Sequence, residues 1–286
     1  MSANPAAGPI SEASVVVADL KPARARLAAA LGWDADAEPT RFDAGRARSW
    51  GRPGLADAAS CVLAPPSGQG GAIRLIQSPS DASVGHAPFR RIGWSAIELQ
   101  VADASAAVRR AEAAGLRVLG MPRAIGDGGS LPIRAGQVAD ETGLVLYLTQ
   151  IMGDVMGFDL PRIRGDTDGV FIAVLSVEDL DGVRDVLERR LGTTRASDRL
   201  SPIGVINATL GLPSDTKHRL SSLQLKGDSL LEIDQLDAHH DPPESATCPP
   251  SMGLVAISAQ ADVPTRTVFE PCPGAILELI PNDAGE

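Results

Sequence analysis

Acidic side chains occupy single positions within otherwise aliphatic stretches of this sequence, where a polar residue is costly unless it has a role. A carboxylate in such a place can take a proton from a carbon next to a carbonyl group, while a guanidinium or a phenol stabilises the enolate oxygen. The alternative is a buried ion pair, which costs about as much as it gains. The candidate catalytic residues are Glu98, Arg74, Tyr147, Glu232 and Glu278.

The order strand, Asp, helix, Gly occurs three times along the chain. An aliphatic run ends at an Asp, as at Asp19, a predicted helix N-cap, and a helix follows that ends at a Gly. The predicted strands and helices are 13–20 with 21–32, 96–103 with 104–115, and 172–179 with 180–192. Each unit closes with an apolar strand, at 72–77, 144–149 and 230–234.

A fourth unit lacks its helix. The closing strand at 275–280 follows the run 253–258 with too few residues between them for a full helix. Turn-rich and Pro-rich segments at 78–91, 152–168 and 237–251 separate the four units. The middle segment is the best domain boundary. We therefore predict an N-terminal domain at 1–152, a linker at 153–168 and a C-terminal domain at 169–286, with two modules in each.

Several short motifs follow this order: the run 15–20 with Leu-Gly-Trp at 31–33, the run 140–147, and the triplets Leu-Glu-Ile at 231–233 and Leu-Glu-Leu at 277–279. In these features the chain resembles the vicinal oxygen chelate superfamily, which includes glyoxalases, bleomycin resistance proteins and extradiol dioxygenases. The resemblance implies an α+β fold of four βαβββ modules, paired into two curved mixed-sheet domains that each surround a cleft. The fourth module is expected to be shortened.

Side chains alternate between the two faces of a strand, so the resemblance also implies which residues meet the cleft. The apolar face of each first strand should pack on the helix of its own module. The opposite face of the first strands then carries Glu98, and the cleft side of the closing strands carries the other four candidate catalytic residues: Arg74, Tyr147, Glu232 and Glu278. The same face supplies the predicted substrate-binding residues Gln100, Ser14, Ser176, Val174 and Asp234.

Members of the superfamily that use a metal place His or Glu on the first strands and Glu on the closing strands. The corresponding first-strand residues here are Glu12, Ala96 and Ile172, and none is a His. We therefore expect no cofactor, with a divalent iron, manganese or zinc ion as the alternative. The ligands of such a site would be Glu232 and Glu278, completed by His218, Asp234 or water. Without a metal, this pair is either a set of plain strand residues or an acid/base pair in which one carboxyl has a raised pKa. His86 and His239-His240 fall in the turn-rich segments.

The charge of the chain limits its partners. A formal net charge of −10 leaves no basic stripe for nucleic acid or for an anionic membrane surface. No apolar run approaches the roughly 20 residues of a membrane span, and no secretory signal is visible, so we expect a cytoplasmic protein. The expected partner is a small-molecule substrate. Two modules per cleft are already present in one chain, so a cleft can be completed without a second copy, and a homodimer is an open alternative.

The function expected from this resemblance is proton transfer on a small, largely apolar, oxygen-bearing organic molecule, by a lyase or isomerase that lacks the usual metal. Glu98 would be the base, Arg74 and Tyr147 its electrophilic partners, and Glu232 with Glu278 an alternative pair. One alternative is a metal-dependent ring-cleavage dioxygenase, because four modules in one chain are the layout of that group. Another is a small-molecule binding or resistance protein without chemistry.

Overall fold

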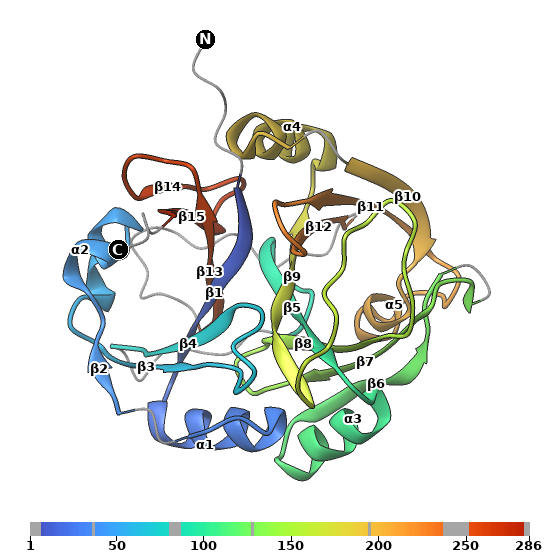
Figure 1. Cartoon of the computed structure of the whole chain (residues 1–286), viewed down its shortest axis with the longest axis horizontal. Helices are drawn as coiled ribbons and strands as arrows, with labels where there is room; N and C mark the ends of the chain where they lie inside the picture. Colours follow the sequence, from blue (N-terminus) through green and yellow to red (C-terminus); the bar gives the residue numbers. More distant parts are fainter. Residues whose placement is uncertain are drawn as a thin grey trace.

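Two curved β-sheets lie back to back in this chain, and the concave side of each looks away from the other (Figure 1). The computed structural model describes residues 7–35, 38–79, 87–126, 129–193, 196–236 and 252–282. One sheet, sheet A, has seven strands, and the other, sheet B, has eight. We call the concave side of each sheet its inner face.

Sheet A combines strands from the first and fourth modules. These are β1 (Ala7–Val17), β2 (Thr40–Arg41), β3 (Ala59–Leu63), β4 (Ala72–Gln77), β13 (Gly253–Ala261), β14 (Thr267–Phe269) and β15 (Ile276–Pro281). Their order across the sheet is β14-β15-β13-β1-β4-β3-β2. The first strands β1 and β13 pair antiparallel at the centre, and each also pairs in parallel with the closing strand of its own module.

Sheet B repeats this plan with the second and third modules. Its strands are β5 (Gly93–Val101), β6 (Arg117–Ala124), β7 (Ile133–Ala139), β8 (Val145–Ile151), β9 (Thr167–Val177), β10 (Ala196–Pro202), β11 (Lys217–Gln224) and β12 (Leu230–Gln235). Their order is β10-β11-β12-β9-β5-β8-β7-β6, with β5 and β9 antiparallel at the centre. The edge strands are therefore β10 and β6.

The predicted pairing of consecutive modules is wrong. Each sheet takes strands from both 1–152 and 169–286, so the sheets do not follow the predicted division of the chain. The segment 153–168, predicted to separate two domains, instead joins β8 to β9 within sheet B. Alternation along a strand reveals which face is apolar, but it carries no information on which other first strand lies beside it.

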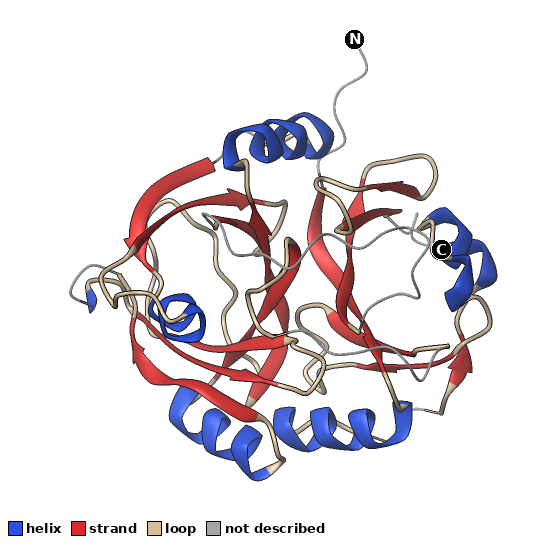
Figure 2. Cartoon of the chain, turned by 180° about the vertical axis from the view of Figure 1, so that it is seen from behind, coloured by secondary structure: helices blue, strands red, loops and turns tan. Residues whose placement is uncertain are grey.

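Three helices complete the modules on the outer faces of the sheets: α1 (Leu20–Leu31), α3 (Ala104–Ala113) and α4 (Leu180–Leu191). Helices α1 and α3 lie side by side along one edge of the molecule, and α4 lies at the opposite edge (Figures 1 and 2). The predicted caps are present. Asp19, for example, accepts a hydrogen bond from the Lys21 amide, and Gly32 and Gly192 end their helices at φ values of 70° and 67°.

A single apolar core lies between the sheets and these helices. It contains all the residues predicted to face the helices from the first strands: Val15, Val17, Ile97, Leu99, Val101, Ala173, Leu175 and Val177. The two sheets also touch at a backbone crossing, where the Gly169 amide donates to the Gln69 carbonyl over 2.8 Å. A Cβ atom at Gly169 would overlap the Gly71 carbonyl oxygen, so this crossing requires glycine. The predicted α+β fold with a shortened fourth module is confirmed.

Two short helices that the sequence patterns did not predict cover the inner faces. The segment with α2 (Ala44–Ser49) and the 3₁₀ turn η1 (Pro53–Leu55) packs Phe42 and Trp50 onto the inner face of sheet A. Helix α5 (Gly204–Leu210) packs Val205 and Ile206 onto the inner face of sheet B. None of the helices in the described ranges combines the length and the apolar character of a membrane span.

Candidate functional site

The predicted catalytic residues divide between the two sheets. Arg74 on β4 and Glu278 on β15 belong to sheet A. Glu98 on β5, Tyr147 on β8 and Glu232 on β12 belong to sheet B. The predicted sets of Glu98 with Arg74 and of Glu232 with Glu278 are therefore wrong, because both depended on pairing consecutive modules.

On the inner face of sheet A, an arginine from α2 binds both acidic residues. Nη2 of Arg46 lies 2.8 Å from Glu12 Oε1 and 2.6 Å from Glu278 Oε2, and its Nε donates to both oxygens of Glu278. The same Nη2 lies 2.9 Å from the Ser258 hydroxyl oxygen. The guanidinium carbon is 4.7 Å from the Trp50 ring centre. Glu12, Glu278 and Ser258, each on a different strand, thus all bind one guanidinium.

Two further arginines add to this network. Arg74 binds Glu12 Oε2 at 2.8 Å, and Arg266 binds Glu278 Oε1 at 2.9 Å. Burial opposes the ionisation of Glu12, but the charges of Arg46 and Arg74 outweigh it and lower its pKa. Ser14, a predicted substrate-binding residue, donates to Glu12 instead. The two acidic residues on the inner face of sheet A are thus bound by arginines of the chain itself.

The inner face of sheet B instead contains a cavity of about 630 Å³. Its walls come from edge strands β6 and β10, from α5, and from the segment predicted as a domain linker. Apolar side chains dominate these walls: Leu131, Ile133, Ile151, Val155, Met156, Phe158, Leu160, Phe171, Leu200, Ile203 and Leu220. A cavity with apolar walls and a few polar groups is the usual form of a small-molecule site.

Two acidic residues, Glu98 and Glu232, stand at the floor of this cavity. The Thr149 hydroxyl donates to Glu98 Oε2 over 2.8 Å. Burial, and then the charge of Glu232, raise the pKa of Glu98 to about 8. Glu232 binds Arg199 on β10 at 3.0 Å, yet burial still raises its pKa. These two carboxyl groups are therefore titrating acids, unlike Glu12 in sheet A.

A third acid and a phenol lie beside this pair. Burial, and then the charge of Glu232, raise the pKa of Asp234, and neither of its oxygens has a hydrogen-bond partner among the described residues. Tyr147 lines the cavity, and burial followed by the charges of Asp234, Glu232 and Glu98 raises the pKa of its hydroxyl. Tyr147 therefore keeps its proton at neutral pH and can donate it in a hydrogen bond.

Known structures share this architecture. Glyoxalase I from Zea mays superposes with a TM-score of 0.60 at 13% identity, covering 95% of this chain and 92% of its own. The chain has the fold of glyoxalase I. A "putative dioxygenase" from Bacillus subtilis superposes with a TM-score of 0.57 at 15% identity, covering 96% and 86% of the two chains. No family model and no curated protein sequence matches. The fold expected from the predicted resemblance is therefore confirmed.

The residues present do not fit the metal that this fold implies. In sheet A, the Arg46 guanidinium already occupies the carboxylate oxygens of Glu12 and Glu278. In sheet B, the β9 neighbour of Glu98 is Ile172, which cannot bind a metal, and Arg199 holds Glu232. Within the described ranges, no three His, Cys, Asp or Glu side chains are grouped to hold a metal ion. The donor set therefore disfavours a resident metal and the ring-cleavage alternative with it.

His218, which the sequence predicted as a metal ligand, has a structural partner instead. Its Nε2 atom lies 2.7 Å from Asn207 Oδ1, which fastens β11 to α5. Because Glu278 belongs to the other sheet, the predicted set of Glu232, Glu278 and His218 cannot form one site. His86, His239 and His240 lie outside the described residues.

The remaining predicted substrate-binding residues are not among those that line the cavity. Gln100 donates over 2.8 Å to the Pro161 carbonyl and so holds the 153–168 segment against β5. Val174 packs in the apolar cluster under α5. The buried Ser176 hydroxyl pairs with no described residue, and its backbone is in register with Asp234. The sequence patterns did not predict four further residues of the two inner faces: Arg46, Arg123, Thr149 and Arg199. The three arginines lie outside the first and closing strands. Thr149 was predicted only as the end of a closing strand.

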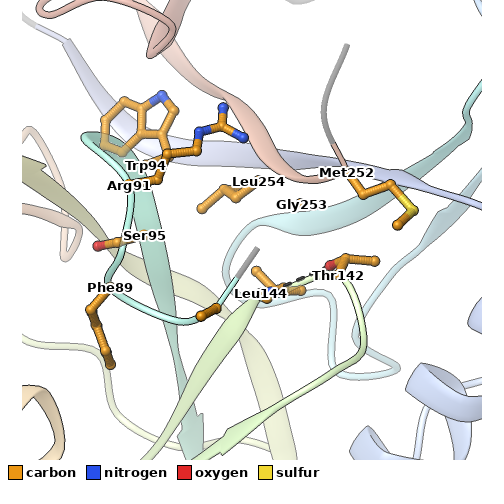
Figure 3. A pocket seen from close by; sticks show the side chains of 11 residues that line it. Phe89, Arg91, Trp94, Ser95, Thr142, Leu144, Met252, Gly253 and Leu254 are labelled. Atoms are coloured by element: carbon orange, nitrogen blue, oxygen red, sulfur yellow. Dashed lines mark hydrogen bonds between the residues drawn. The ribbon is translucent and has the colours of Figure 1, made fainter. Parts of the chain in front are cut away.

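A second, much smaller pocket opens at the junction of the two sheets (Figure 3). It lies between the start of β5, the loop before β8 and the start of β13. Trp94, Thr142 and Leu254 are among the side chains around it. Its volume of about 30 Å³ has room for one or two water molecules. The sheet B cavity is therefore the candidate functional site.

Proposed function

We propose that the sheet B cavity is the active site of an enzyme that transfers a proton on a small, largely apolar molecule carrying a carbonyl or related oxygen group. The reaction would be that of a lyase or an isomerase. One observation carries this proposal: Glu98 is a buried carboxyl at the cavity floor with a pKa of about 8. A general base works best when its pKa lies near the operating pH.

The surroundings of Glu98 suit a base. Thr149 holds Oε2 of the carboxyl group, and Oε1 has no hydrogen-bond partner among the described residues. That oxygen is free to take a proton from a bound substrate. The charge of Glu232 nearby makes the ionised form of Glu98 less stable, and so makes it a stronger base.

Two groups can stabilise the oxygen on which negative charge then develops. The protonated hydroxyl of Tyr147 can donate a hydrogen bond to an enolate oxygen. Arg199 lines the same cavity and supplies positive charge while it binds Glu232. The apolar walls exclude water, which strengthens both interactions. Glu232 is the group that tunes Glu98.

The test is hydrogen–deuterium exchange, which needs no knowledge of the natural substrate. A panel of ketones and aldehydes with acidic C–H bonds is incubated with the protein in D₂O, and deuterium incorporation is followed by NMR. We expect exchange with the unaltered protein and a loss with Glu98→Gln. Glu112→Gln, an exposed change on α3, is the matched control and should keep the exchange. Equal exchange by Glu98→Gln, or none by the unaltered protein, would contradict the proposal.

A second candidate is a protein that binds a small molecule without chemistry. The size of the cavity and the predominance of apolar side chains in its walls favour it. Binding of an apolar molecule that persists in a Glu98→Gln/Glu232→Gln double variant, without exchange by any form of the protein, would support this candidate.

A further inference from the structure

The mouth of the sheet B cavity lies between the two edges of the sheet. Strands β6 and β10 form these edges, and α5 directly follows β10 and contacts β6. Each edge strand contributes one arginine to the cavity lining, Arg123 from β6 and Arg199 from β10. Among the residues that the structure describes, the other charged side chains in the lining are those of Glu98 and Glu232.

The two arginines differ in their partners. Arg199 binds Glu232 at 3.0 Å. Arg123 forms no ion pair or side-chain hydrogen bond with any other described residue. Its positive charge nevertheless acts on the Tyr147 hydroxyl and lowers the pKa of that group against the effect of burial and the nearby acids. Arg123 is itself exposed, so its guanidinium lies at the rim of the cavity and not at its floor.

The position of Arg123 depends on a glycine. Its guanidinium packs against Gly204, the first residue of α5, and a Cβ atom at that position would overlap Nη2. The contact spans the mouth of the cavity, because it joins one edge of the sheet to the helix that follows the other edge. The side chain of Arg123 is thus held at the mouth by packing and not by an acidic partner.

The charges around the cavity leave Arg123 uncompensated. Arg199 is paired with Glu232. Burial raises the pKa values of both Glu98 and Asp234 and so disfavours their charged forms. A cation that faces an apolar cavity favours an anion as its partner, and a guanidinium matches a carboxylate with two parallel hydrogen bonds.

We propose that Arg123 binds the carboxylate of a substrate that has one negative charge and an apolar body, and so determines which molecules this site accepts. The apolar body would lie against Phe158 and Phe171 in the cavity wall. This inference rests on the proposed function, because it names the substrate class of the same cavity. An organic carboxylic acid with an acidic C–H bond fits both.

Binding is measured by calorimetry at pH 7 with four probes: octanoate, phenylacetate, octanamide and octylamine. We expect the unaltered protein to bind at least one of the carboxylates ten times more tightly than the neutral amide or the amine. Arg123→Gln should abolish this preference. Arg117→Gln, an exposed change at the start of the same strand, is the matched control and should keep it.

A second variant displaces the guanidinium without removing its charge. Gly204→Ala places a methyl group where Nη2 now lies, so we expect it to weaken carboxylate binding at least threefold. No binding of either carboxylate by the unaltered protein, tighter binding of octylamine, or unchanged carboxylate binding by Arg123→Gln would each overturn the inference.

The outcomes also separate this inference from the proposed function. Glu98→Gln should lose deuterium exchange and keep the preference for carboxylates. Arg123→Gln should lose that preference, whereas the control Arg117→Gln should keep both the exchange and the preference. Exchange without a carboxylate preference would refute only the role of Arg123, and a preference without exchange would refute only the proton-transfer function.

Discussion

The inner face of each sheet carries a pair of buried acidic residues, but the electrostatic surroundings of the two pairs are opposite. In sheet A, three arginines contact the two buried acids, and the pKa of Glu12 is lowered. In sheet B, among the described residues, Arg199 alone forms an ion pair with one of the two acids, Glu232, and the pKa values of both Glu98 and Glu232 are raised. The number of guanidinium groups within reach thus decides whether a buried carboxyl is a fixed charge or a titrating acid.

The short helices inserted between strands produce this difference. In sheet A, the segment around α2 places Trp50 and the Arg46 guanidinium on the acids and fills the concave space. In sheet B, α5 covers only one end of the inner face with Val205 and Ile206. The other end remains a cavity, and the acids at its floor can meet a ligand.

The largest expected effect is on the ion-pair network of sheet A. Arg46→Ala leaves Glu12 and Glu278 buried with too little positive charge, which should lower the free energy of unfolding by about 3–5 kcal/mol. Urea denaturation measures this loss. The matched control is Arg26→Ala, which removes an exposed partner of Glu141 and should cost under about 1 kcal/mol. Equal losses in the two variants would show that the buried ion pairs of sheet A contribute no more to stability than the pair of Arg26 and Glu141.

A comparison of equivalent acids tests where the chemistry resides. We expect Glu98→Gln to lower the deuterium exchange rate about 10²–10⁴-fold while the protein stays folded. Glu12→Gln should instead lower the stability and leave the rate per folded molecule unchanged, because the partners of Glu12 among the described residues are Arg46, Arg74 and the Ser14 hydroxyl. NMR exchange rates and urea denaturation of both variants give the answer. A slower rate in Glu12→Gln would place chemistry in sheet A.

The raised pKa of Glu98 predicts how stability depends on pH. Its pKa rises from 4.5 to about 8 on folding, so its protonated form stabilises the protein fully below about pH 4.5. This contribution is lost as the pH rises toward and through 8, with a total change on the order of 5 kcal/mol. Glu98→Gln cannot ionise and should show a flatter profile in urea denaturation between pH 5 and 9. Identical slopes would mean that Glu98 titrates normally.

The smallest expected effect concerns the single arginine on the acid pair. Arg199 favours ionisation of Glu98 and Glu232, so Arg199→Gln should raise the apparent pKa of the exchange reaction by about one unit. The pH dependence of the exchange rate measures the shift. Arg162→Gln, which alters an exposed arginine, is the control and should leave the profile in place. A shift to lower pH would show that Arg199 does not tune the pair.

Local patterns in the sequence were sufficient to predict the modules. Asp and Gly at the helix ends, and alternation along the first strands, predicted α1, α3, α4 and the buried face of each sheet, since these features depend on near neighbours in the chain. They also placed Glu98, Tyr147 and Glu232 on the inner face. The three prove to share one cavity.

The sequence by itself determined the repeated module, its apolar faces and the isolated acids among them. Only the tertiary structure decided that the first module pairs with the fourth and the second with the third, and so which acids meet. It also decided that Arg46 neutralises one set of acids while Glu98 keeps its proton near neutral pH. The physical reason is that pKa values and cavities depend on groups far apart in the chain, whose distances no local pattern encodes.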